Sequence, residues 1–213
     1  MREIKEHWEH IHATKAPDEV SWFEPVAKLS LSLIERVARD RDAAIIDVGA
    51  GASTLVDGLI SDGYQAITVL DISPSALERA RERLGDRATS VAWHEADILS
   101  ADLPAAAFDV WHDRAVFHFL TAKADRARYV AQLRRALRPH GHAIVATFAE
   151  AGPASCSGLD VVRYSPNTLH REFGRDFRLV TSGHEMHRTP RGAEQAFTYC
   201  VLNYEPIELG RIL

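Results

Sequence analysis

A glycine-containing turn closes the first strongly apolar stretch of the chain, and it reads Asp47-Val48-Gly49-Ala50-Gly51. Glycines let the backbone turn sharply and approach a ligand closely, and a helix that starts after the turn would offer free N–H groups. A second apolar stretch ends at Asp71, about 20 residues further on, where a carboxylate can bind both hydroxyls of a ribose. These residue types at this spacing predict a nucleotide site. The alternatives are a merely tight turn and an aspartate that caps a helix.

The charges of this site favour one nucleotide over another. A dinucleotide site normally reads GxGxxG, but Thr54 stands at the third glycine position. Asp47 would repel a pyrophosphate and attract a cationic ligand. S-adenosylmethionine carries a sulfonium and an ammonium and no phosphate, so the pattern favours it over NAD. Asp97 and Ile98 follow a third β-like run and could meet an adenine, although Asp97 could instead only cap a turn.

The elements that position these residues alternate between β-like and helical patterns, which predicts βαβ units around a mainly parallel sheet. Before the first strand we expect a helix over 25–39, preceded by an N-terminal arm that carries Trp8, Trp22 and Phe23. The end of the chain reads as an antiparallel hairpin, because a Pro-Gly turn separates two strand-like runs. Expected strands cover 43–48, 66–71, 90–94, 108–111, 142–148, 177–188 and 195–204, and expected helices cover 53–62, 73–84, 121–138 and 165–174.

Length and composition fit one globular domain. The chain has 213 residues, and domains average about 150. We divide it into an arm and helix (1–40), cofactor-binding units (41–150) and an acceptor-side loop, helix and hairpin (151–213). A net charge of -5 gives no attraction for nucleic acid or an anionic membrane. No secretory signal, membrane-length apolar run or metal-ligand spacing is seen, so we expect a cytoplasmic protein without a metal.

Together these segments resemble the class I S-adenosylmethionine-dependent methyltransferases. The matching motifs are DVGAG, VLDIS, EADIL, FDVWHDRAVFHF and LRPHGHAIVATF, and the resemblance covers about residues 40–150. It implies an α/β, Rossmann-like, seven-stranded mainly parallel sheet, with an antiparallel last strand and helices on both faces. The arm WEHIHATKAPDEVSWFEP looks like the tryptophan-bearing cover of the thiol and thiopurine branch, so the nearest branch is expected to be that one.

The resemblance assigns roles residue by residue. Asp47 and the Gly49–Gly51 backbone would hold the methionine part of the cofactor, and Asp71 would bind the ribose. The remaining cofactor-binding residues it implies are Ile72 and Ile98 on the adenine ring, Asp97 at its amino group, Asp113 beside the methyl donor and Trp22 in the cover. The third glycine common in the first motif is Ser53 here, a small residue and a good N-cap.

A base is needed only where the methyl acceptor arrives protonated, and histidine is the usual proton acceptor at neutral pH. The stretch after the fourth strand therefore supplies the catalytic candidates, His112, Asp113 and His118. Each has a plainer reading, because Asp113 could pair with Arg114, His112 could be buried and His118 could face solvent. Cys156 could contact a soft substrate or be a small buried residue.

The acceptor is expected to be a small molecule, possibly a thiol. No NPPY-type motif is seen, which argues against amino-group methylation of bases or glutamine, and the DxGT-type pattern of several protein-lysine methyltransferases is also absent. Two alternatives stay open, a protein-lysine methyltransferase and a module that binds S-adenosylmethionine without turnover. The partner is then a small-molecule substrate, with no nucleic acid and no membrane.

Overall fold

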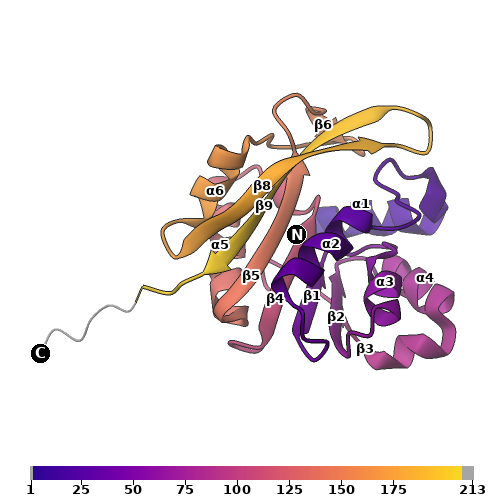
Figure 1. Cartoon of the computed structure of the whole chain (residues 1–213). Helices are drawn as coiled ribbons and strands as arrows, with labels where there is room; N and C mark the ends of the chain where they lie inside the picture. The colour runs from indigo at the N-terminus through magenta and orange to yellow at the C-terminus, as the bar shows by residue number, and fades with distance from the viewer. Residues whose placement is uncertain (1, 208–213) are drawn as a thin grey trace, which may run out of the picture.

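The computed structural model describes residues 2–207, which form a seven-stranded sheet with the order β3-β2-β1-β4-β5-β9-β8. Neighbouring strands from β3 to β5 are parallel, whereas β9 is antiparallel to both β5 and β8. This confirms the predicted Rossmann-like sheet with an antiparallel last strand (Figure 1). The strands are β1 (Ala44–Val48), β2 (Ala66–Asp71), β3 (Val91–Glu95), β4 (Phe108–Arg114), β5 (Leu137–Phe148), β8 (Phe177–Arg188) and β9 (Glu194–Tyr204).

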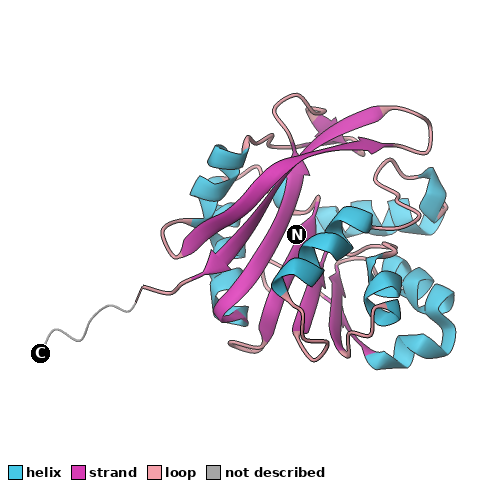
Figure 2. Cartoon of the chain, in the orientation of Figure 1, coloured by secondary structure: helices cyan, strands magenta, loops and turns pink. Residues whose placement is uncertain are grey.

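Helices cover both faces of the sheet, as Figure 2 shows. On one face Ile34, Leu59 and Leu77 pack from α2, α3 and α4, and on the other Leu133 and Phe173 pack from α5 and α6. No helix within residues 2–207 has the length and apolar character needed to cross a membrane. The helices are α1 (Arg2–Thr14), α2 (Lys28–Val37), α3 (Leu55–Ser61), α4 (Pro74–Leu84), α5 (Lys123–Ala136) and α6 (Pro166–Phe173), with short 3-10 turns η1 (Pro17–Glu19), η2 (Gly85–Ser90) and η3 (Phe117–Phe119).

The pleat of β1 and β4 decides which side each polar residue faces. Successive side chains of a strand point to opposite faces, and Ile45 belongs to the α2-side core whereas Ile46 belongs to the α5-side core. Asp47 therefore shares the α2 side with His112, its cross-strand neighbour on β4. Asp113, one residue on, faces the α5 side. Two adjacent residues of one motif thus serve opposite faces of the sheet.

Two expected boundaries are wrong in an informative way. The helix expected over 121–138 ends at Ala136, and β5 begins at Leu137 rather than at His142. Leu137 already has extended backbone angles and pairs with Phe108, and Pro139 favours extended structure in the residue before it. Pro139 and Gly141 therefore lie inside the strand, where the register shifts between Phe108 and Val110.

The N-terminal arm is largely helical, which the sequence interpretation did not predict. Helix α1 buries Ile11 and His12 and half-buries Ile4 and Trp8, so one face of the helix carries all four, as spacings of three and four residues require. The loop after Cys156 forms a second small sheet, β6 (Ser155–Cys156) and β7 (Leu159–Asp160).

Candidate functional site

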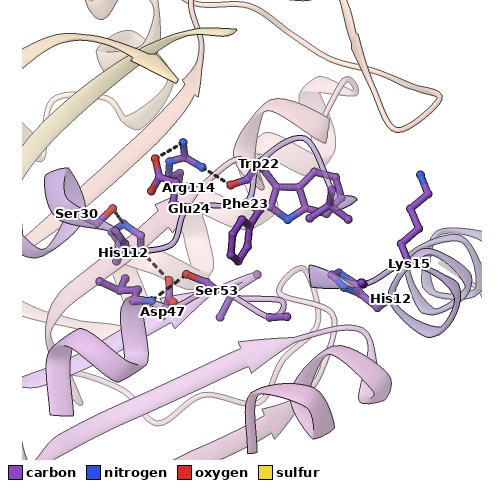
Figure 3. A pocket seen from close by; sticks show the side chains of 17 residues that line it. His12, Lys15, Trp22, Phe23, Glu24, Ser30, Asp47, Ser53, His112 and Arg114 are labelled. Carbon is purple, nitrogen blue, oxygen red and sulfur yellow. Dashed lines mark hydrogen bonds and ion pairs between the residues drawn. The ribbon is translucent and has the colours of Figure 1, made fainter. Parts of the chain in front are cut away.

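Two adjoining cavities lie at the carboxyl ends of β1, β2 and β4. The main cavity has a volume of about 480 Å³ and the side cavity about 50 Å³. Both are lined by His12, Trp22, Gly49 and Arg114, so they form two parts of one cleft beneath the N-terminal segment. Figure 3 shows the side cavity, with Trp22 and Phe23 between the β-strand residues and His12.

The glycine turn forms the floor of this cleft. Gly49 and Gly51 both have positive φ angles, 64° and 56°, which residues with a Cβ rarely adopt. A Cβ on Gly49 would lie 1.9 Å from a methyl of Val116. The N–H of Gly51 donates to Asp71 Oδ2 over 2.7 Å. The turn expected from DVGAG is therefore built so that only glycine fits at Gly49.

Asp71 lies at the end of β2 and lines the main cavity. Its Oδ1 accepts from the N–H of Ser73 over 2.8 Å, and the side chain is buried. Burial raises the pKa of Asp71 to about 6, and repulsion from Asp47 adds to this, against the opposing effect of the backbone hydrogen bonds. A bound ligand that donates hydroxyl hydrogens would favour the carboxylate.

The residues expected at the adenine also line the main cavity, namely Ile72, Asp97 and Ile98. Asp97 Oδ1 accepts from the N–H of Leu99 over 2.9 Å, so the carboxylate also caps a turn. Both readings of Asp97 are compatible with this geometry, because each oxygen of a carboxylate has two lone pairs.

Asp47 faces the side cavity together with His112 and Ser30. Asp47 Oδ1 lies 2.7 Å from His112 Nδ1, and His112 Nε2 lies 2.9 Å from Ser30 Oγ. Figure 3 shows these three side chains in line. Asp47 Oδ2 is buried and has no hydrogen-bond partner among the described residues. A buried unpaired carboxylate oxygen is costly, so this position suits a ligand that donates a hydrogen bond.

Aromatic rings also line the main cavity. The ring centroid of Trp8 lies 5.8 Å from that of Trp22 and 5.0 Å from that of Phe119, with all three rings lining the cavity. Cys156 also lines it, and burial raises the pKa of its thiol. These three rings give the main cavity an apolar surface, and they offer π faces to a cation.

Polar contacts hold the cover in place at two points. Glu9 of α1 accepts from the hydroxyl of Ser73 over 2.6 Å and from the N–H of Ser75 over 3.1 Å, so α1 caps the start of α4. Arg114 pairs with Glu24 over 3.0 Å and donates to the carbonyl of Trp22 over 3.3 Å. The arm is thus fixed both to α4 and to the end of β4.

Two of the three catalytic candidates are buried behind the residues that line the cleft. Asp113 is fully buried and accepts from the hydroxyl of Tyr129 over 2.5 Å and from the N–H of Val116 over 2.9 Å. The pairing of Asp113 with Arg114 considered above is absent, because Arg114 binds Glu24. His118 Nδ1 accepts from the N–H of Phe148 over 3.2 Å, and its ring is fully buried. Neither residue is among those that line the two cavities.

His12 lines both cavities and was missed in the sequence. Its Cε1 lies 3.2 Å from where a Cβ on Gly51 would be. Burial lowers its pKa to about 4, with a smaller contribution from Arg79, so the ring is neutral at neutral pH. The four-residue spacing between Trp8 and His12, which puts both on one helical face, is the signal that could have found it.

Comparison with known proteins agrees with the fold and the glycine turn. Residues 45–141 match a family model described as a methyltransferase domain. The malonyl-[acyl-carrier protein] O-methyltransferase of Anoxybacillus flavithermus is 30% identical over 125 residues, 58% of this chain and 45% of that protein. An eEF1A lysine and N-terminal methyltransferase of Danio rerio is 22% identical over 148 residues, 68% of this chain and 21% of that protein.

A solved structure shares the fold over almost the whole chain. It is the Burkholderia thailandensis 1,6-didemethyltoxoflavin-N1-methyltransferase with bound S-adenosylhomocysteine, which has a TM-score of 0.70, 18% identity and coverage of 96% of this chain and 87% of that one. The chain spans less than half the length of the two curated relatives named above. Residues 45–141 are therefore similar to a methyltransferase domain, and the chain shares the fold of a methyltransferase whose structure holds S-adenosylhomocysteine.

Proposed function

We propose that the protein is an S-adenosylmethionine-dependent methyltransferase that acts on a small-molecule nucleophile, with a thiol as the favoured acceptor. One observation carries the proposal. A single main cavity is lined both by Asp71, Ile72 and Asp97 and by the rings of Trp8 and Trp22. The first set suits an adenosine, and the second suits a sulfonium and its acceptor.

The chain's own residues fit this cofactor. Asp71 can accept hydrogen bonds from ribose hydroxyls, and Asp97 can accept one from an adenine amino group. Asp47 Oδ2 has no hydrogen-bond partner among the described residues and can accept from a ligand. Carboxylates in the cleft favour a ligand with an ammonium and a sulfonium and disfavour the pyrophosphate of NAD. The S-adenosylhomocysteine bound to the Burkholderia thailandensis enzyme supports the same assignment.

When bound, S-adenosylmethionine would supply the methyl group of its sulfonium: the lone pair of the acceptor would form a bond to the methyl carbon while the methyl–sulfur bond breaks, and the electron pair of that bond would stay on the sulfur of S-adenosylhomocysteine. The work left to this chain is to align the acceptor and exclude water. Trp8, Trp22 and Phe119 cover the cleft, and their π faces favour the positive charge of the sulfonium. Glu9 and Arg114 hold that cover down through α4 and β4.

The protonation states in the cleft favour an acceptor that arrives with a free lone pair. Among the described residues that line the main cavity, His12 is the one histidine, and its pKa of about 4 makes it a weak base. Burial also lowers the pKa of His118 to about 3, with help from Arg114. A thiol loses its proton near pH 8.5, so a small thiol can react as a thiolate without a protein base.

The covered cleft supports a small acceptor more than a protein side chain. A lysine methyltransferase needs an open groove, whereas here α1 and the segment after it lie over the cavity. A binding module without turnover would share every contact above, so a turnover assay must separate it from an enzyme.

The test is methyl transfer from S-adenosylmethionine to a series of small thiols with different pKa values. S-adenosylhomocysteine formation is measured against pH, with Asp71→Asn as the control for this site. We expect transfer whose pH midpoint follows the pKa of each thiol. A midpoint that stays fixed across the series would show a protein base. Binding without any transfer would favour the non-catalytic module, and transfer only to lysine peptides would favour the protein-lysine alternative.

A further inference from the structure

Three side chains from three elements form a buried line beside the cleft. Ser30 comes from α2, His112 from β4 and Asp47 from β1, and each is less than a tenth exposed. His112 lies between the other two, at 2.9 Å from Ser30 Oγ and 2.7 Å from Asp47 Oδ1. Asp47 and His112 are paired in the sheet, so the backbone itself fixes their separation.

The carboxylate of Asp47, at one end of this line, determines the direction of both hydrogen bonds. An ionised carboxylate only accepts, so the hydrogen between Asp47 and His112 belongs to His112 Nδ1. His112 Nε2 is then an acceptor, and the hydroxyl of Ser30 donates to it. Asp47 therefore selects the tautomer of a neutral His112 that carries its hydrogen on Nδ1, and Ser30 supplies the donor that His112 Nε2 then needs.

The line leaves one atom of Asp47 for a ligand. Oδ1 is occupied by His112, whereas Oδ2 is buried without a partner among residues 2–207. The side cavity of about 50 Å³ that Asp47 lines adjoins the glycine turn, and a single small charged group fits a space of this size. Arg114, Glu24 and Lys15 also line this cavity. Because Glu24 pairs with Arg114, Asp47 Oδ2 is the carboxylate oxygen that has no partner there among the described residues.

We propose that His112 is a positioning residue that, held by Ser30, turns Asp47 Oδ2 toward the ammonium group of the cofactor's amino-acid part. This rests on the proposed function and assigns to His112 a part in ligand selection instead of proton transfer. His112 restrains the carboxylate in a single orientation, so the ammonium meets an oxygen already aimed at it. The protein thereby distinguishes nucleosides that carry this group from nucleosides that lack it.

A purely structural line makes a different prediction. If Ser30 and His112 only join α2 to the sheet, then breaking the line loosens the whole cleft and weakens every nucleoside ligand alike. If His112 acts through Asp47, only ligands with an ammonium lose affinity. Two ligands separate the cases, S-adenosylhomocysteine and 5′-methylthioadenosine, which has the same adenosine and sulfur but no amino-acid part.

The experiment is calorimetric titration of both ligands into the full chain and three variants. His112→Leu removes both hydrogen bonds, whereas His112→Asn keeps an N–H near the position of Nδ1 and is the matched control. A hydrogen bond that orients a charged group is worth about a factor of ten or more. We therefore expect His112→Leu to bind S-adenosylhomocysteine at least about tenfold more weakly, with His112→Asn within about threefold of the wild type.

Binding of 5′-methylthioadenosine is expected to change less than about twofold in all variants, and it also reports that the cleft is folded. Should His112→Leu fail to fold, Ser30→Ala decides, because it removes the hydrogen bond that holds the His112 ring and should weaken S-adenosylhomocysteine alone. Equal losses for both ligands, or no loss for either, would overturn the inference. A wild-type protein that binds neither nucleoside would instead overturn the proposed function.

Discussion

Gly49→Ala is the substitution that most directly tests the close packing of the glycine turn. The structure predicts two separate losses of unfolding free energy. The φ angle of 64° puts an alanine in the left-handed region, at about 1 kcal/mol. Its Cβ would also lie 1.9 Å from a methyl of Val116, and valine has little freedom to rotate away. Overpacking of this kind costs about 1–3 kcal/mol, so we expect a total loss of about 2–4 kcal/mol of unfolding free energy.

Gly192→Ala is the matched control. Gly192 also has a positive φ, 83°, and a Cβ there meets nothing within 4 Å. It should lose only the backbone cost of about 1 kcal/mol. The difference between the two variants isolates the contact with Val116. Because Val116 also lines the main cavity, Gly49→Ala should weaken S-adenosylhomocysteine, whereas Gly192→Ala should not.

Val116→Ala completes a double-mutant cycle. It removes the methyl that the new Cβ meets, so Gly49→Ala combined with Val116→Ala should recover about 1–3 kcal/mol relative to the sum of the single losses. Urea unfolding of the four proteins gives the coupling energy. If Gly49→Ala is no worse than Gly192→Ala, or if the cycle shows no coupling, then the described packing of the turn against Val116 is incorrect.

Three further predictions concern charges in and around the cleft. Because burial raises the pKa of Asp71 to about 6 and a bound ribose favours the carboxylate, S-adenosylhomocysteine should release protons on binding near pH 6 but not at pH 8. The affinity for S-adenosylhomocysteine should therefore rise between about pH 5 and pH 7. Calorimetry in buffers of different ionisation heat measures the proton release. Asp71→Asn should abolish the proton release and the pH dependence of the affinity. Although burial works to raise it, hydrogen bonds from Ser73 and Ser75 lower the pKa of Glu9 from 4.5. The contribution of Glu9 is thus complete above pH 4.5 and is lost as the pH falls through the lower folded pKa. Glu9→Gln should cost about 0.5 kcal/mol of unfolding free energy at pH 7 and progressively less as the pH falls below 4.5. A cost that does not decline with pH in acid unfolding measurements would contradict the described contact. Cys156 should react slowly with iodoacetamide because burial raises the pKa of its thiol. Bound S-adenosylhomocysteine should slow this reaction further. A labelling rate that the ligand does not change would mean that the ligand binds elsewhere.

Local sequence patterns were sufficient to predict the sheet and to find Asp71 and Asp97, which line the main cavity. A strand, a tight turn and a helix follow one another within a few residues, and Asp71 and Asp97 sit at strand ends by the same logic. These features depend on neighbours in sequence, so a single chain reveals them. The length of β5 was not predicted, because Pro139 and Gly141 are residues that usually end a helix or a strand. Here the strand accommodates both of them near its register shift.

Contacts between distant segments could not be predicted in the same way. Ser30 meets His112 and Glu9 meets Ser73 across more than sixty positions, and neither pair has a signature in the sequence. The orientation of Asp113 was within reach, however. The alternation of β4 puts Trp111 and Asp113 on one side and His112 on the other, so reading that alternation from Trp111, a residue too large to be exposed cheaply, would have separated the two candidates.

Calorimetric titration with S-adenosylmethionine and, separately, with NAD tests the central assignment most directly. The cleft described here should bind S-adenosylmethionine and not NAD, and Asp71→Asn should lose most of that affinity while remaining folded. If NAD binds as well as S-adenosylmethionine, or if S-adenosylmethionine fails to bind the wild-type protein, the carboxylates of the cleft do not select the ligand and the proposed function is wrong.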